Sequence, residues 1–166
     1  MKKKVFSLAL ALIMVLVTLT GCGKASYSAA SSFSYSSDKG HSYGDGTKEY
    51  SVGDTVYMKV IFKVTSDKKK TSQVKVVLSI PKIESVDAKY MDGQVITPNY
   101  DAANNVTTYE FTANASQTAV EQECVIQFVP NATGSVTMTL VYDDKIDPSY
   151  DIQSTLEFVE MDKTED

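Results

Sequence analysis

Only a few side chains in this sequence have the chemistry to act on a substrate. They include two cysteines, Cys22 and Cys124, and one histidine, His41. Nucleophilic catalysis needs a base within hydrogen-bond reach of the nucleophile. His41 lies in a serine- and glycine-rich segment that cannot hold that geometry, and Cys124 alternates with Ile126 and Phe128, as a small apolar core residue does. The sequence therefore predicts a protein that is not an enzyme.

Four aspartates form a second group that could do chemistry, as calcium ligands. They lie within nine residues and are Asp143, Asp144, Asp147 and Asp151. Calcium takes several oxygen ligands from such a loop, but the spacing is not that of an EF-hand, and Lys145 and Pro148 interrupt it. We expect a solvated acidic loop here. No cofactor is expected, because the chain has too few cysteines and histidines for a zinc site of that type.

The position of Cys22 points to a different kind of chemistry. Three lysines, Lys2 to Lys4, precede 16 residues without a charge, and small residues follow. This order is typical of a secretory signal peptide. A membrane-spanning helix is the alternative, but it needs about 20 apolar residues, and Gly21 with a polar tract ends this run early. The sequence favours a signal peptide over residues 1–21.

The residues Leu19-Thr20-Gly21-Cys22 resemble the lipobox of bacterial lipoproteins. In that family the cysteine thiol takes a diacylglyceryl group, and the signal peptidase then cuts directly before the cysteine. The resemblance implies that Cys22 is the lipid attachment site and that the mature chain is anchored to the extracytoplasmic face of a bacterial membrane. Two acyl chains suffice for this, since each buried CH₂ contributes about 0.8 kcal/mol.

Composition excludes some partners. Without residues 1–21 the chain has 13 lysines and 21 acidic residues, a net charge of about −8, and it has no arginine anywhere. Nucleic-acid binding leaves a basic patch as its electrostatic footprint, so nucleic acid is not expected as a partner. Cys124 is the only thiol left beyond Cys22, so an internal disulfide is not expected, and an apolar core must hold the fold together.

The chain divides into segments of different composition. Residues 23–47 contain eight serines and four glycines, too little apolar surface to offset the entropy of ordering them. We therefore expect residues 22–47 to form a lipidated, flexible linker. Residues 48–161 have the size of a single domain, and residues 162–166 form an acidic tail.

Residues 48–161 carry the pattern of β-strands. Apolar residues alternate with polar ones at residues 56–64 and 74–80, which is typical of half-buried strands. Further runs cover residues 83–90, 94–97, 106–113, 122–129, 135–142 and 152–159. Glycines and prolines lie between the runs, and no helical period appears. The sequence predicts an all-β fold, a single immunoglobulin-like antiparallel β-sandwich of about seven to eight strands.

Two short motifs support this fold by resemblance. Val52-Gly53-Asp54-Thr55-Val56 and the later Ile80-Pro81 resemble the conserved-repeat Ig-like domains of bacterial surface proteins, and cohesin-like sandwiches open similarly. Both resemblances imply a β-sandwich that binds or spaces, and neither supplies catalytic residues.

Three functions follow as alternatives. The first is a non-enzymatic, lipid-anchored surface module for binding or envelope organisation, with an envelope protein as partner. The second is a glycan or ligand receptor that uses the loop tyrosines Tyr90, Tyr100 and Tyr150. The third is an enzyme inhibitor or an enzyme.

Overall fold

The computed structural model describes residues 25–46, 49–68, 71–81, 86–90 and 95–160, with backbone only for 86–90 and 95. These residues form eleven strands and one short 3₁₀ helix. The elements are β1 Tyr27–Ser36, β2 Tyr50–Ser51, β3 Val56–Ser66, β4 Ser72–Pro81, β5 Val86–Tyr90, β6 Val95–Ile96, β7 Asn99–Asp101, β8 Val106–Ala115, β9 Gln122–Phe128, β10 Gly134–Tyr142, η1 Pro148–Tyr150 and β11 Ile152–Val159. No helix among the described residues is long and apolar enough to span a membrane.

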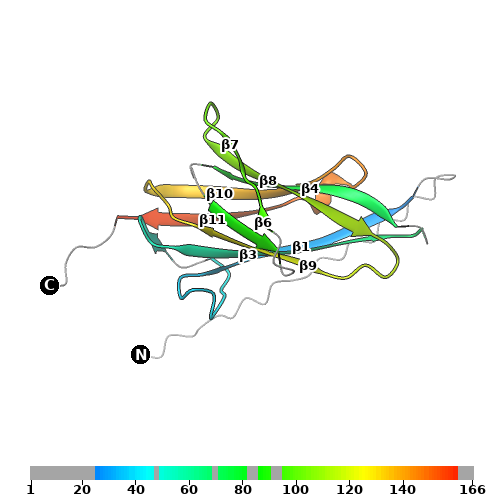
Figure 1. Cartoon of the computed structure of the whole chain (residues 1–166), viewed down its shortest axis with the longest axis horizontal. Helices are drawn as coiled ribbons and strands as arrows, with labels where there is room; N and C mark the ends of the chain where they lie inside the picture. The colour runs from blue at the N-terminus through cyan, green and yellow to red at the C-terminus, as the bar shows by residue number, and fades with distance from the viewer. Residues whose placement is uncertain (1–24, 47–48, 69–70, 82–85, 91–94, 161–166) are drawn as a thin grey trace.

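The strands form two sheets that pack face to face (Figure 1). One sheet has the order β1-β3-β9-β5-β6, and the other has the order β2-β11-β10-β4-β8-β7. Strand pairs within the sheets are antiparallel, apart from the short β2, which runs parallel to β11. The predicted immunoglobulin-like sandwich is confirmed: the neighbours β3-β9-β5 and β11-β10-β4 correspond to the B-E-D and G-F-C strands of that fold.

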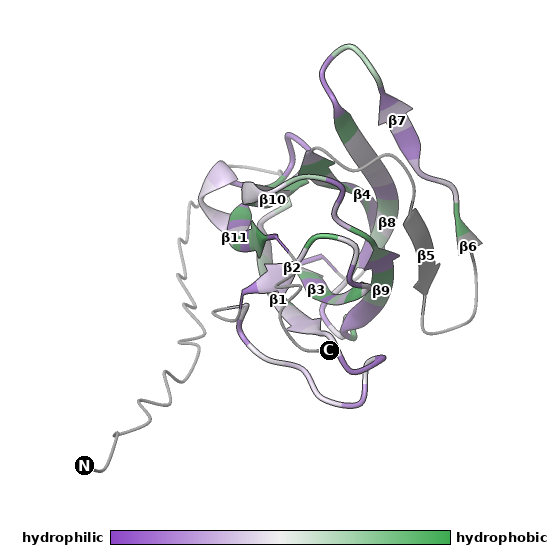
Figure 2. Ribbon diagram, turned by 90° about the vertical axis from the view of Figure 1, so that its left-hand side faces the viewer, coloured by the Kyte–Doolittle hydropathy of each residue, from purple (hydrophilic) through white to green (hydrophobic). Residues whose placement is uncertain are grey.

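Alternating side chains from both sheets fill the core. Every second residue of β3, from Val56 to Val64, is buried, and so is every second residue of β4, from Val74 to Ile80. Phe62 packs on Phe111 across the two sheets, with ring centroids 5.6 Å apart. Figure 2, seen along the strands, shows the hydrophobic stretches of both sheets. The predicted facing of these strands is confirmed because the side-chain period of two leaves each strand only one apolar face.

The first strand corrects the predicted domain boundary. Residues 22–47 are expected to be a flexible linker, but Tyr27–Ser36 form β1, which pairs with β3 over its full length, from Tyr27 opposite Ser66 to Ser36 opposite Tyr57. Tyr35 is 2% exposed and belongs to the core. The linker prediction is therefore wrong for these residues. On the inward face of β1, Tyr27, Ala29, Phe33 and Tyr35 supply apolar surface, although the segment as a whole is rich in serine.

The strand count is also refined. Eight strands are five residues or longer, within the predicted number, but the set differs: β1 is added, and the expected run over residues 94–97 is reduced to the two residues of β6. The other predicted long runs correspond to β3, β4, β5, β8, β9, β10 and β11. The predicted acidic tail, residues 162–166, lies outside the described residues.

Candidate functional site

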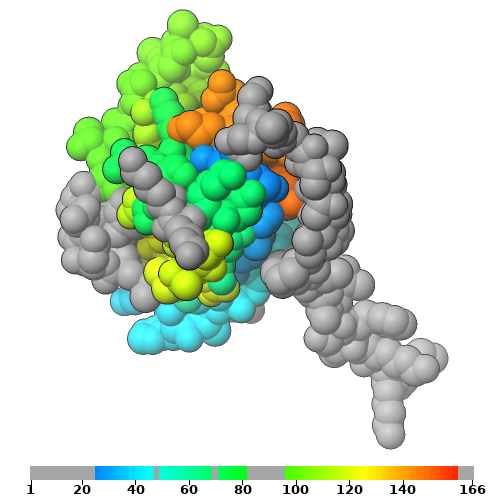
Figure 3. Space-filling view, turned by 90° about the vertical axis from the view of Figure 1, so that its right-hand side faces the viewer, coloured from blue at the N-terminus to red at the C-terminus, as the bar shows by residue number. Residues whose placement is uncertain are grey.

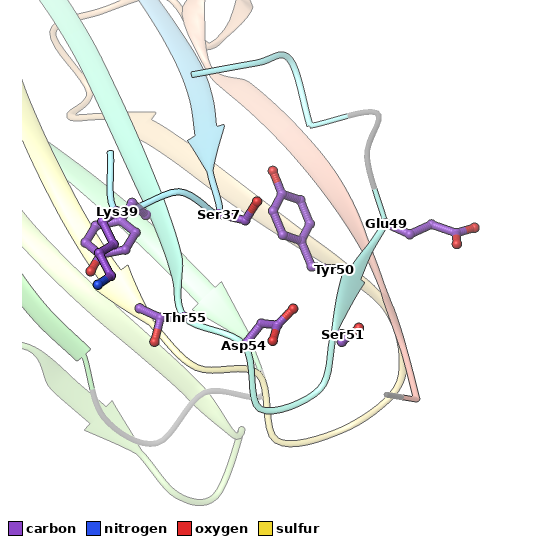
Figure 4. Close-up of a pocket in the computed structure, with 8 residues that line it drawn as sticks. Ser37, Lys39, Glu49, Tyr50, Ser51, Asp54 and Thr55 are labelled. Carbon is purple, nitrogen blue, oxygen red and sulfur yellow. The ribbon is translucent and has the colours of Figure 1, made fainter. Parts of the chain in front are cut away.

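A polar pocket of about 490 Å³ opens at one end of the sandwich. It lies between the loop that follows β1 and the turn that joins β2 to β3 (Figure 4). We call residues 37–46 the Asp38 loop and residues 52–55 the β2–β3 turn. The side chains that line the pocket are Ser37, Lys39, Glu49, Tyr50, Ser51, Asp54, Thr55 and Tyr57.

One carboxylate organises the Asp38 loop. Asp38 Oδ1 accepts hydrogen bonds from the backbone N–H groups of His41 and Ser42, each at 3.0 Å. The hydroxyl of Ser36 donates to Oδ1 and that of Ser42 donates to Oδ2. These bonds, led by the one from Ser36, hold the pKa of Asp38 well below its usual value. The ionised carboxylate therefore fixes the turn that carries Lys39 to the pocket.

The backbone of this turn is left-handed at two successive residues. Lys39 has φ 63° and Gly40 has φ 81°. A non-glycine residue in this region is uncommon and costs about 1–3 kcal/mol, and such residues cluster at functional sites. The hydrogen bonds to Asp38 hold Lys39 in this conformation, at the rim of the pocket.

Further contacts attach the Asp38 loop to the sheets. Tyr35 and Gly44 exchange two backbone hydrogen bonds of 2.9 and 2.8 Å. The Tyr43 ring lies under the Lys59 ammonium, 4.2 Å from the ring centroid, and Lys59 also pairs with Glu123 at 3.7 Å. A cation held over a tyrosine face contributes about 0.5–1 kcal/mol at an exposed site. The loop is therefore part of the domain and not a spacer.

The floor of the pocket belongs to the core. Tyr50 is 4% exposed, and its ring packs on Phe158 with centroids 6.5 Å apart. Burial, with a smaller contribution from the charge of Asp45, raises the pKa of Tyr50, so this phenol stays protonated. In Figure 4, Asp54 projects from the β2–β3 turn toward Tyr50, whereas Glu49 points outward. The turn itself is closed by a hydrogen bond from Asp54 N to Ser51 O at 3.1 Å.

Of the four aspartates considered as calcium ligands, three accept local hydrogen bonds. We call residues 143–151 the acidic loop. Asp143 accepts hydrogen bonds from Lys75 N at 3.0 Å and from Lys145 N and Nζ, both at 3.1 Å. Asp147 caps η1 by accepting from Ser149 N at 2.8 Å, and Asp151 accepts from Tyr142 N at 3.0 Å. Asp144 is exposed. Backbone N–H groups and one lysine thus donate to three of the four carboxylates.

The carboxylate of Asp143 attaches the acidic loop to the neighbouring strand β4. Burial alone would raise the pKa of Asp143, but the hydrogen bonds from Lys75 and Lys145, with the Lys145 charge, lower it. Lys145 also donates to Gln73 O at 2.9 Å, which ties the loop to β4. Among the described residues, no three His, Cys, Asp or Glu side chains gather in a group that could hold a metal ion.

The loop tyrosines do not converge on one surface. Tyr100, on β7, is 38% exposed and donates to Asn105 Oδ1 at 3.0 Å. Tyr150, in η1, packs against the core. The Tyr90 side chain lies outside the described residues. The tyrosines that line the pocket are Tyr50 and Tyr57, which the sequence analysis did not select.

The thiols and the histidine are placed apart. Cys124 is fully buried on β9 and free, and burial raises its pKa to about 12. His41 is exposed on the Asp38 loop, so the two do not form a nucleophile and base. Cys22, the expected lipid attachment site, lies outside the described residues.

The chain has no sequence match among curated proteins and only weak structural similarity to solved structures. No protein-family model and no curated protein matches the chain. Among solved structures, it is similar to the C-terminal domain of the Streptococcus agalactiae AgI/II polypeptide BspA, with 13% identity and a TM-score of 0.49, covering 77% of this chain and 49% of that one. This chain thus spans about half the length of that structure.

Two further structures are more distant. One is AvmM, whose description states that it catalyses macrocyclization in alchivemycin A biosynthesis, with 10% identity, a TM-score of 0.38 and coverage of 70% and 86% of the two chains. The other is the N-terminal domain of PorA, with 14% identity, a TM-score of 0.31 and coverage of 76% and 96%.

Proposed function

We propose that this protein is a lipid-anchored, extracytoplasmic binding module without enzymatic activity. One observation carries the proposal. The signal-like segment of charged, apolar and small residues ends at Cys22, and the first strand begins five residues later, at Tyr27. Cleavage before Cys22 would leave the described sandwich intact. The lipid would therefore hold a folded domain at the outer face of a bacterial membrane, for binding or envelope organisation.

The distance from the anchor to the domain is short. Each residue spans at most about 3.6 Å, so five residues reach no further than about 18 Å. The backbone N–H of Ser26 donates to Asp67 Oδ1 at 2.9 Å, and Asp67 N donates to Ser26 O at 3.0 Å. The chain is thus attached to the β3–β4 turn even before β1 begins. The domain would stand close to the bilayer rather than at the end of a long linker.

The anchor is tested by labelling the protein with a fatty acid in a bacterial host. The variant Cys22→Ser should lose the label and keep its N-terminal segment, because a hydroxyl does not replace the thiol as nucleophile. Cys124→Ala is the matched control: it removes the other cysteine and should keep the label. Incorporation of labelled fatty acid into Cys22→Ser would contradict the proposal.

A receptor role is the second candidate function. The pocket between the Asp38 loop and the β2–β3 turn supports it, since small-molecule sites are concave and usually largely pre-formed. An exposed loop that is held by hydrogen bonds to a sheet suits the same role.

A further inference from the structure

We infer that the pocket between the Asp38 loop and the β2–β3 turn binds a saccharide. This deepens the proposed function, on which it rests for the location of the protein outside the cell. The first reason is the lining: its eight residues are serines, a threonine, tyrosines, a lysine and two acids, and none is aliphatic. Sugars present hydroxyl groups that both donate and accept hydrogen bonds, together with C–H faces that pack on aromatic rings.

The second reason is the state of the polar groups. Among the described residues, Lys39, Asp54 and Thr55 form no side-chain hydrogen bond or ion pair, although all three line the pocket. They offer a charged donor, a charged acceptor and a hydroxyl that can do both. Hydrogen bonds to charged groups are stronger than those between neutral groups. A ligand with many hydroxyls is the one that can use all three.

The third reason is rigidity. Tyr50 is fixed in the core, Tyr57 is half-buried on β3, and Asp54 stands on a closed turn. The backbone turn that carries Lys39 is held by the hydrogen bonds to Asp38. Binding to a site whose parts are already in place loses less side-chain entropy. The pocket therefore needs little rearrangement to take a small polar ligand.

Other ligand classes fit this lining less well. A peptide is held by a free sheet edge or by apolar pockets for its side chains, and no aliphatic residue lines this pocket. A phosphate or other anion would lie beside two carboxylates, Glu49 and Asp54, with a single lysine to offset them. A metal ion would need a third acidic or histidine ligand, and no such group of three exists among the described residues.

The inference is tested by calorimetric titration of the full-length lipidated protein in a detergent without a sugar headgroup. Three tetrasaccharide probes are used: a glucose oligomer, an N-acetylglucosamine oligomer and a glucosamine oligomer. They show whether binding depends on the hydroxyl, the acetamido group or the positive charge of the sugar. We expect saturable binding of at least one, with a Kd in the millimolar range or tighter. Asp54→Asn keeps the shape of the side chain and Tyr57→Ala removes the ring, and each should weaken binding by at least about tenfold.

The control is Asp144→Asn, an exposed aspartate of the acidic loop, which should bind like the original protein. Circular dichroism and the melting temperature show whether each variant is folded, and Asp54→Asn should be, since its side chain has no described partner. Absence of saturable binding for all three probes would overturn the inference. It would also be overturned if Asp54→Asn and Tyr57→Ala both bound a probe as tightly as the original protein does. Fatty-acid labelling at Cys22 is unaffected by either outcome, so the two proposals fail separately.

Discussion

At the scale of single residues, the carboxylate of Asp38 holds the Asp38 loop through the hydrogen bonds that it accepts. Hydrogen bonds from the Ser36 and Ser42 hydroxyls, followed by backbone N–H groups, lower its pKa in the folded protein. The stabilisation is therefore present above the ordinary aspartate pKa of about 3.9 and is lost as the pH falls through the lower value of the folded state. At neutral pH the Asp38 loop keeps its form.

We expect NMR titration of the Asp38 carboxyl carbon to give a pKa below that of an ordinary aspartate. The amide signals of His41 and Ser42 should follow the same titration, because both donate to this carboxylate. The variant Asp38→Asn should lose the pH dependence and shift the signals of the Asp38 loop at neutral pH. A titration of Asp38 at the ordinary value would mean that the loop is not held by this side chain.

Residues also explain which parts of the site could be predicted. The buried places of Phe62, Phe111 and Phe128 follow from alternation alone and are confirmed. The pocket could not be found in this way, since Lys39 and Asp54 come from segments that meet only through the pairing of β1 with β3. The turn sequence "SDKG" at residues 37–40 was one local signal and Gly53-Asp54 was another, because aspartate and glycine together often mark a turn.

At the scale of elements, β1 is the strand that composition concealed. Its ten residues, "YSAASSFSYS", include five serines and no aliphatic residue larger than alanine. Yet Tyr27, Phe33 and Tyr35 occupy alternate positions, so all three lie on the face that packs against the core. The mean composition of a segment predicted disorder, whereas its period of two favours a strand, and the period was the better guide.

The role of β1 predicts a specific loss of stability. Tyr35→Ala should lower the free energy of unfolding by about 3–5 kcal/mol, as removal of a large buried aromatic side chain does. Ser32→Ala, an outward residue of the same strand, should change it by less than about 0.5 kcal/mol. Urea denaturation followed by circular dichroism measures both. An unchanged midpoint for Tyr35→Ala would restore the interpretation of this segment as a linker.

At the scale of the whole molecule, β1 separates the end of the domain nearest the proposed anchor from the pocket. Tyr27 lies beside Ser66 at one end of the sandwich, and Ser36 lies beside Tyr57 at the other. Ten residues of strand cover about 30 Å between these ends. Figure 3 shows the first end, where the start of β1, in blue, lies near the acidic loop, in orange. A lipid on Cys22 would thus leave the pocket on the side that faces away from the membrane.

This arrangement is tested by two fluorescent labels on the protein in vesicles that contain an acceptor lipid. Lys68→Cys places a label beside Asp67, which binds Ser26 near the anchor. Asn131→Cys places one beside Pro130, whose carbonyl accepts from Gly53 N at 3.0 Å at the pocket end. Cys124→Ala is included in both to remove the remaining thiol.

Energy transfer to the bilayer should be strong from a label at residue 68, because the short connection to Cys22 keeps that end of the sandwich near the membrane. It should be weak from a label at residue 131, because the length of the strands separates the pocket end from the membrane. Equal transfer from both labels would mean that the domain lies on its side, so that the pocket is not presented away from the membrane. The same pair of labels on Cys22→Ser, which should not take up the lipid, provides the baseline for transfer that does not depend on the anchor.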